Sequence, residues 1–295
     1  MDEGGLIRQL RGRITDPPGV LGIGDDCCVW TPGGPSCLSV DTVVEGRHFL
    51  TSDDPAAIGR KAAGAALSDL AAMGARPVGA VVALSCPGHW PAMTIMEGLI
   101  RELERHGCPL LGGDTTASSE LTISVTVWGE RVAGRFLTRA GGRTGDLLVV
   151  TGPLGGSFAS KRHLRPEPRL QEGQWLAGQP YVHAMMDISD GLAADVRSLA
   201  TASGCGFLLL PGEVPVHDDV PAMSDTARAA CCEGEDFELL LAVDAEHWPN
   251  VQLAWPFPKP LSRIGWLLQN PAEVLMEDRN GQVVPFLWQG FAHRS

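Results

Sequence analysis

The chain has 295 residues, of which 44% are hydrophobic and 20% are charged, and its formal net charge is −12. This length is typical of two domains of about 150 residues each. The negative charge argues against nucleic acids and membranes as partners, because nucleic acids and anionic lipids are bound chiefly through Lys and Arg, and no apolar run reaches the roughly 18 residues that span a bilayer. The acidic N-terminus lacks an apolar signal core, so we expect a cytoplasmic protein.

Acidic residues occur at two places before the first predicted helix. Residues 24–26 read Gly-Asp-Asp, a pattern that on its own indicates a turn. Residues 37–45 predict a strand of β-branched residues in which Asp41 interrupts an apolar run. A carboxylate inside such a strand needs a partner, because burying an isolated charge is costly.

A helix is predicted over residues 54–73, because Asp followed by Pro is typical of a helix start and Gly74 of a helix end. Asp69 lies in the last turns, where the helix dipole disfavours a negative charge by up to about 1 kcal/mol. A bound cation would reverse this penalty. The alternative interpretation is a solvated surface side chain.

Three further elements complete the first half: a strand at 78–85, a helix at 91–107 and a half-buried strand at 121–128. Between the last two, residues 112–116 read Gly-Gly-Asp-Thr-Thr. Paired glycines allow the backbone to approach a ligand closely. Asp114 and two hydroxyl groups follow them directly.

A basic, glycine-rich stretch at 139–145 marks the predicted domain boundary. It divides the chain into an N-terminal domain of residues 1–138 and a C-terminal domain of residues 139–295. Residues 160–180, rich in Arg and Pro, predict a helix end and an exposed connection.

The second half is organised around residues 186–192, where a strand ends and a helix begins at Gly191. Asp187 and Asp190 are three residues apart, so this bend can direct both carboxylates to one point, with Ser189 and the N–H groups of the new helix beside them. Carboxylates this close repel each other unless a cation lies between them. The alternative is that Ser189 or Asp190 only caps the helix.

The remaining predicted strands cover residues 206–210, 233–243, 263–268 and 274–276. Strands outnumber helices, and neither a strict alternation of strand and helix nor an all-β spacing holds. We therefore expect an α+β protein with mixed or antiparallel sheets.

The acids that border glycines or element ends form one group: Asp25, Asp26, Asp41, Asp69, Asp114, Asp187 and Asp190. Mg²⁺ prefers oxygen ligands and is typically held by a few carboxylates together with substrate phosphates. Several such ions would also allow an acidic protein to bind a polyphosphate. The sequence has no P-loop, no protein-kinase catalytic loop and no Gly-x-Ser-x-Gly elbow. This pattern favours phosphoryl transfer, which depends on positioning and metal electrostatics.

The order of the motifs resembles the thiamine-monophosphate kinase family, which shares a superfamily with aminoimidazole ribonucleotide synthetase and selenophosphate synthetase. The resemblance covers nearly the whole length and rests on six segments: residues 24–26, 41–49, 68–75, 112–116, 187–192 and 234–239. It implies two α/β domains, the N-terminal one pairing through its sheet in a homodimer. The active site would lie near the domain and subunit junction.

The resemblance also implies an activity and a set of site residues. The γ-phosphoryl group of ATP would pass directly to thiamine monophosphate with the help of several Mg²⁺ ions. Catalysis would depend on Asp69, Asp187 and Asp190. The metal ligands would be Asp26, Ser39, Asp41, Asp69, Asp114, Asp187 and Asp190. The nucleotide would contact Gly113, Arg139 and Ser189, and thiamine monophosphate would contact His48, Glu235 and Phe291.

Two other functions are compatible with the sequence. The first is another ATP-using enzyme of the superfamily. Selenophosphate synthetase would carry a reactive Cys near the N-terminus, and residues 4–6 have none. Aminoimidazole ribonucleotide synthetase would lack the signature that residues 44–49 carry. The second is a non-catalytic protein that binds nucleotide or thiamine phosphate. It would be permitted by the departures from the family pattern: Val40, Ala66, His106 and a short connection over 157–185. The retained acids favour catalysis, because neighbouring carboxylates repel each other and a protein that only binds its ligand does not require them.

Overall fold

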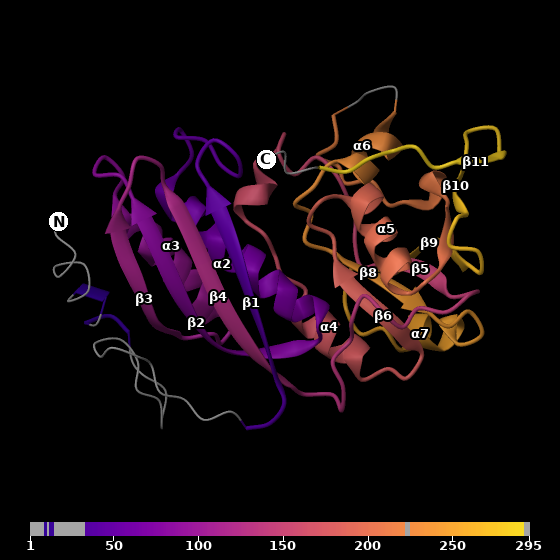
Figure 1. Cartoon of the computed structure of the whole chain (residues 1–295), viewed down its shortest axis with the longest axis horizontal. Helices are drawn as coiled ribbons and strands as arrows, with labels where there is room; N and C mark the ends of the chain where they lie inside the picture. Colours follow the sequence, from indigo (N-terminus) through magenta and orange to yellow (C-terminus); the bar gives the residue numbers. More distant parts are fainter. Residues whose placement is uncertain (1–8, 11, 15–32, 222–224, 292–295) are drawn as a thin grey trace. The chain divides into compact units, whose positions relative to one another are not determined.

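The computed structural model describes residues 9–10, 12–14, 33–221 and 225–291. The chain divides into two compact units, and Figure 1 colours it from indigo to yellow along the sequence. The first unit comprises Met1–Leu70, Ala75–Val132 and Leu164–Glu167, and the second comprises Ala71–Gly74, Ala133–His163 and Pro168–Ser295. Within the described ranges, no helix combines the length and the apolar character that crossing a bilayer requires.

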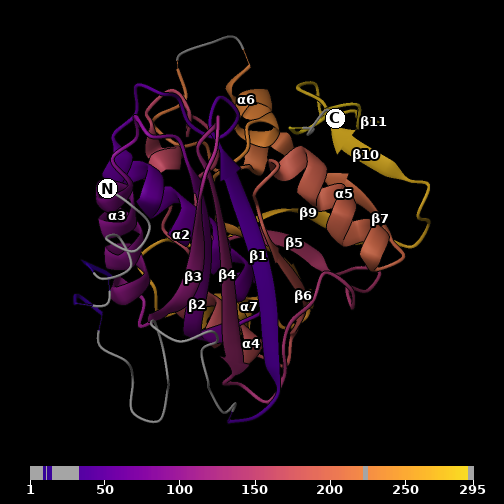
Figure 2. The same ribbon diagram turned by 60° about the vertical axis from the view of Figure 1, so that its left-hand side comes forward.

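The described part of the first unit is a four-stranded sheet with helices on one face, as Figures 1 and 2 show. Its elements are β1 (Ser36–Val44), α2 (Pro55–Ala72), β2 (Ala75–Cys86), α3 (Ala92–Arg105), β3 (Leu110–Ala117) and β4 (Thr122–Arg131). The order across the sheet is β1-β4-β2-β3, so β1 and β3 form opposite edges. β4 is antiparallel to both its neighbours, whereas β2 and β3 run parallel.

Helices α2 and α3 approach each other at the level of the backbone. A Cβ atom on Gly59 of α2 would lie 1.9 Å from the carbonyl oxygen of Ile95, and one on Gly98 of α3 would lie 1.9 Å from that of Ala56. Glycine at both positions therefore allows close packing of the helices. The predicted start of α2 is confirmed, since the Asp54 carboxylate accepts a hydrogen bond from the N–H of Ala57 at 3.2 Å.

The described residues of the second unit form a seven-stranded sheet in the order β11-β10-β7-β9-β5-β8-β6. Its strands are β5 (Leu147–Val150), β6 (Val182–Asp187), β7 (Gly206–Leu209), β8 (Leu239–Val243), β9 (Ser262–Leu268), β10 (Val274–Glu277) and β11 (Val283–Pro285). Its helices are α4 (Leu170–Ala177), α5 (Leu192–Ala202), α6 (Thr226–Cys232) and α7 (Trp248–Ala254), with short 3-10 turns at Arg162–Leu164 and Pro211–Glu213.

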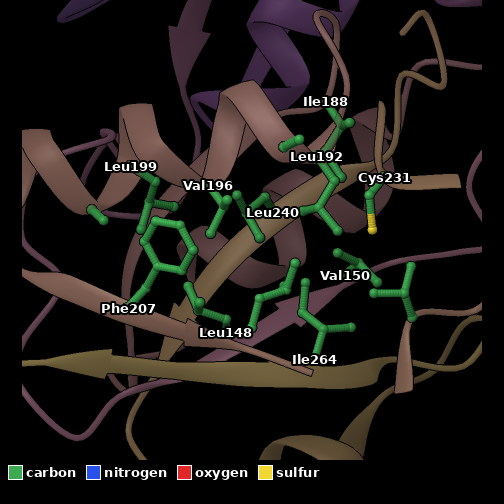
Figure 3. Close-up of a cluster of buried hydrophobic side chains, with 14 of the residues drawn as sticks. Leu148, Val150, Ile188, Leu192, Val196, Leu199, Phe207, Cys231, Leu240 and Ile264 are labelled. Carbon is green, nitrogen blue, oxygen red and sulfur yellow. The ribbon is translucent and has the colours of Figure 1, made fainter. Parts of the chain in front are cut away.

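Helix α5 is held against this sheet by apolar side chains. Figure 3 shows Val196 and Leu199 of the helix directed towards Phe207, Leu240 and the strands, and all these side chains are fully buried. Because α5 begins where β6 ends, this packing fixes the bend between the two elements.

The mixed sheets of both units confirm the predicted α+β class. Two local expectations are wrong. Residues 233–238 do not continue β8 as a strand, because they turn away to hydrogen-bond with the backbone of Ile188 and Ser189. The stretch 160–180 is more than a helix end and connection, since it contains α4. The pairing of the N-terminal sheet in a homodimer stays a prediction.

Candidate active site

Three of the predicted metal ligands gather at one edge of the sheet in the first unit. Ser39 Oγ donates a hydrogen bond to the carboxylate of Asp69, which α2 brings over edge strand β1. Asp41 lies two residues after Ser39 and so faces the same side of the sheet. Its carboxylate accepts a hydrogen bond from the N–H of Thr42 at 2.7 Å. This edge therefore carries a group of side-chain oxygen atoms.

Asp114 lies at the opposite edge of the same sheet, on β3. Across the four strands, the residue of β3 that aligns with Asp41 is Gly113, through its pairing with Val82. Asp114 comes one residue later, so its side chain faces the opposite side of the sheet from Asp41. Three strand spacings separate β1 from β3, about 14 Å in all. Within this unit Asp114 thus stands apart from the edge group, and its part in a shared ligand set stays a prediction.

The glycine at position 113 is required by close packing within the sheet. A Cβ atom there would lie 2.2 Å from the carbonyl oxygen of Val82. Asp25 and Asp26, the other two acids of the predicted group in the first half, lie outside the described residues.

His48 follows β1 in a tight turn. Its Nδ1 accepts a hydrogen bond from the N–H of Val44 at 3.0 Å. An accepting Nδ1 carries no proton, so the proton of the neutral ring sits on Nε2.

The bend after β6 places the acids of the second unit. Asp187 ends the strand and is 3% exposed, and Gly191 starts α5 with a φ of 92°, a conformation that favours glycine. A Cβ atom on Gly191 would also lie 2.6 Å from the carbonyl oxygen of Glu233. Because Gly191 occupies the N-cap position, the alternative that Ser189 or Asp190 caps this helix is wrong.

Asp195 is a buried carboxylate that the sequence analysis missed. It lies in the first turn of α5 and accepts hydrogen bonds from the N–H groups of Ser189 and Asp190 at 3.0 and 3.2 Å. Burial, together with the charges of Asp187 and Asp190, raises the pKa of Asp195 to about 8. The only sequence signal for it is an acid one turn into the helix, which is more commonly a partner of the helix dipole.

The loop 233–238 lies against this bend. The N–H of Glu235 donates to the carbonyl oxygen of Ser189 at 2.7 Å, and the N–H of Phe237 donates to that of Ile188 at 2.9 Å. Glu235 and Phe237 have φ values of 63° and 52°. Left-handed conformations cost such residues about 1–3 kcal/mol each and cluster at functional sites. The strained loop thus holds Glu235 beside Ser189.

Two further acids of this loop support its shape. Asp236, which is 5% exposed, accepts hydrogen bonds at 3.0 Å from the N–H of Gly155 and from Arg162. Burial raises the pKa of Asp236 to about 7, although both donors act in the opposite direction. Glu233 accepts a hydrogen bond from the N–H of Gly156 at 2.6 Å. The glycine turn at 155–156 is therefore anchored to the loop by carboxylates.

Glu238 ends the loop and is buried among donors. Arg169 donates to it at 2.6 and 2.8 Å, Thr151 at 2.7 Å and Lys259 at 3.2 Å. Burial acts to raise the pKa of Glu238, but Arg169 and its other donors lower it overall. This carboxylate is thus ionised, and side chains of the protein supply its hydrogen bonds.

The last two predicted contacts of the second unit also lie near α5. The N–H of Phe291 donates to the carbonyl oxygen of Asp190 at 2.8 Å, and the residue is 48% exposed. Arg139 Nη1 donates to Ser198 Oγ on the helix at 3.4 Å. The structure therefore gathers Ser189, Asp190, Glu235 and Phe291 around the start of α5, with Arg139 further along the same helix.

The candidate ligands suit Mg²⁺ by their chemistry, because all of them are oxygen donors. Among the described residues, no three His, Cys, Asp or Glu side chains surround a common point. Mg²⁺ is usually held by one or two carboxylates plus water and substrate phosphates. A pair such as Asp187 and Asp190, close enough to act together on the pKa of Asp195, fits this requirement.

The chain is similar over nearly its whole length to proteins of one family. Residues 24–131 match the family of AIR synthase related protein, N-terminal domain. The chain is 32% identical to thiamine-monophosphate kinase of Bacillus subtilis (strain 168), over 96% of this chain and 97% of the relative. The crystal structure of thiamine-monophosphate kinase from Stenotrophomonas maltophilia K279a has a TM-score of 0.83 at 29% identity, over 96% of this chain and 98% of that chain. AaThiL complexed with AMPPCP and TMP has a TM-score of 0.77 at 29% identity, over 99% and 97% of the two chains.

Proposed function

Because the chain belongs to the thiamine-monophosphate kinase family, we propose that it transfers the γ-phosphoryl group of ATP to the phosphate of thiamine monophosphate, which yields thiamine diphosphate and ADP. The observation that carries this proposal is the similarity to thiamine-monophosphate kinases across nearly the whole chain. AaThiL, a relative of known structure, binds AMPPCP and TMP together. AMPPCP is an ATP analogue, so that complex supports ATP as the donor.

The proposed reaction needs no covalent intermediate on the protein. An oxygen of the acceptor phosphate is already ionised near neutral pH, so no general base has to remove a proton from it. The bond from the γ-phosphorus to the bridging oxygen of ADP breaks as the bond to the acceptor oxygen forms. What remains for the protein is to position two anionic substrates.

Each unit carries acids that would hold Mg²⁺. We infer that Asp187 and Asp190 in the second unit, and Asp69 with Ser39 and Asp41 in the first, are the Mg²⁺ ligands. Bound Mg²⁺ would neutralise charge on the phosphates. The hydrogen bonds from Ser189 and Asp190 to Asp195 support this assignment, because they fix the backbone that carries both carboxylates.

We assign the nucleotide contacts to Gly113, Arg139 and Ser189, and the contacts to thiamine monophosphate to His48, Glu235 and Phe291. Arg139 is the cation among them and would face phosphate oxygens. The left-handed backbone of Glu235 supports its role, because strain of this kind is retained where a site requires it. The partly exposed ring of Phe291 offers a flat apolar surface to an aromatic substrate.

A coupled assay of ADP release with ATP, Mg²⁺ and thiamine monophosphate, with the product identified by mass, tests the proposal. Thiamine and an aminoimidazole-pathway substrate serve as parallel acceptors. We expect thiamine diphosphate from the monophosphate alone, and none when EDTA removes Mg²⁺. ADP release with another acceptor would assign a different enzyme of the superfamily. Binding of ATP without turnover of any acceptor would identify a non-catalytic binder.

The homodimer is a separate proposal, which sedimentation analysis at micromolar concentration tests. We expect a mass of twice 31.3 kDa. A monomeric mass over this range would rule it out.

A further inference from the structure

Glu45 occupies a central position in the turn that follows β1. Its carboxylate accepts hydrogen bonds from three separate segments of the described chain. Thr51 Oγ1 donates at 2.8 Å, Trp90 Nε1 at 3.1 Å and the N–H of Leu121 at 3.1 Å. The backbone N–H of Glu45 in turn donates to the carbonyl oxygen of Leu121 at 3.0 Å. One side chain thus joins the turn to the loop before α3 and to the start of β4.

The donors keep this carboxylate ionised. The N–H of Leu121, assisted by Thr51 and Trp90, lowers the pKa of Glu45. Hydrogen bonds to a charged acceptor are stronger than those between neutral groups. The attachment of the turn is therefore firmer than an ordinary loop contact.

The other end of the turn is anchored against the same indole. Phe49 is 2% exposed and its ring meets that of Trp90 edge-on, with the centroids 6.1 Å apart. Gly46 allows the reversal with a φ of 73°, and its N–H donates to the carbonyl oxygen of Phe49 at 2.9 Å. Both ends of the segment 45–49 are thus fixed by Trp90.

His48 lies within this fixed segment and is held in one tautomer. Its own N–H donates to the carbonyl oxygen of Val44 at 3.0 Å, while its Nδ1 accepts from the N–H of Val44. The second bond exists only when Nδ1 is unprotonated. The ring therefore presents Nε2–H, a hydrogen-bond donor, in a defined direction.

We propose that Glu45 is a positioning residue for His48: by fixing the turn 45–49 it keeps His48 as an Nε2–H donor to the anionic acceptor substrate. This inference rests on the proposed function for the identity of that substrate. The positioning itself is a property of the protein alone. Glu45 would act on the affinity for the acceptor and not on the affinity for ATP.

The first test is the tautomer of His48, read from the ¹⁵N shifts of its ring, with the signals assigned from a His48→Gln variant. We expect the Nε2–H form in the native protein and a mixture of tautomers in Glu45→Ala. Glu45→Gln should restore the native signal, since its amide oxygen accepts from Trp90 and Leu121 and its amide N–H₂ donates to Thr51. The same tautomer in Glu45→Ala as in the native protein would overturn the proposal.

The second test separates the two substrates. In Glu45→Ala we expect the KM for thiamine monophosphate to rise by about tenfold, as the loss of one positioned hydrogen bond predicts, with the KM for ATP unchanged. Glu104→Ala, at an exposed position of α3, is the matched control and should alter neither constant. An equal rise in both constants would indicate a structural role alone and refute the proposal.

Trp90→Phe provides a milder variant, which carries the same tests if Glu45→Ala does not fold. It removes the Nε1–H donor but keeps an aromatic ring against Phe49. We expect the same direction of change with a smaller size, and no change in either test would overturn the proposal. If the native protein forms no thiamine diphosphate, the proposed function fails. The ¹⁵N measurement of the His48 tautomer still tests whether Glu45 positions His48.

Discussion

The buried ion pair of Glu238 and Arg169 provides a quantitative test of how the loop 233–238 is held. Glu238 is 2% exposed and accepts two hydrogen bonds from the guanidinium. Removing one partner of a buried pair costs about 3–5 kcal/mol, because the other charge is left unpaired. Lys259 and Thr151 remain beside Glu238 in Arg169→Ala. We therefore expect a loss in the free energy of unfolding at the lower end, about 3 kcal/mol.

The pH dependence of this loss follows from the lowered pKa of Glu238. A carboxyl group whose folded-state pKa is depressed contributes stability that is present above its unfolded pKa, and it is lost as the pH falls through the folded value. The ordinary value for Glu238 is 4.5. The difference in the free energy of unfolding between Arg169→Ala and the native protein should thus reach its full size at pH 7 and decrease below about pH 4.5.

Urea unfolding followed by far-ultraviolet circular dichroism, at pH 7 and at several values below 4.5, measures both effects. Arg76→Ala is the matched control, because Arg76 is 56% exposed where it meets Glu130 and such surface pairs contribute less than about 1 kcal/mol. A loss at Arg169 no larger than this control, or one that grows as the pH falls, would refute the reasoning.

Three further predictions concern the acids themselves. Asp187→Asn and Asp69→Asn should abolish formation of thiamine diphosphate and leave the melting temperature within a few degrees of native, whereas near-normal turnover at saturating Mg²⁺ would refute their role as ligands. Asp195→Ala should lower kcat by about tenfold or more, because the backbone N–H groups of the bend lose their acceptor; an unchanged kcat would show that the bend holds without it. Glu235→Gly should raise the free energy of unfolding by about 1 kcal/mol, since glycine accepts a φ of 63° without strain, and should raise the KM for thiamine monophosphate; lower stability would contradict the strain argument.

Local signals in the sequence are sufficient for the elements that carry the candidate site. The Asp54–Pro55 start and the Gly74 end predict α2, and Gly191 predicts the change from β6 to α5. The alternation of apolar residues predicts β4. Each of these signals acts within a few residues, which is why they can be interpreted without tertiary structure.

The sequence fails where long-range contacts decide the conformation. Residues 233–238 precede an apolar run and so suggest a strand, yet their N–H groups pair with carbonyl oxygens of the bend near Ile188. The position of Asp114 depends on strand order and register, which put it at the edge opposite β1. Spacing along the chain contains neither kind of information.

The acids of this chain divide into two kinds that look alike in the sequence. The carboxyl groups of Asp195 and Glu45 accept hydrogen bonds from backbone N–H groups and so set the shape of the chain around them. Asp187 and Asp69, in contrast, are proposed ligands of Mg²⁺. An amide oxygen still accepts hydrogen bonds from N–H groups, but it carries no charge with which to hold Mg²⁺. Replacement by the amide should therefore separate the two kinds: Asp195→Asn should retain far more activity than Asp195→Ala, whereas Asp187→Asn should be as inactive as Asp187→Ala. Equal losses in the two Asp195 variants would mean that the hydrogen bonds from Ser189 and Asp190 are not what the bend requires of Asp195.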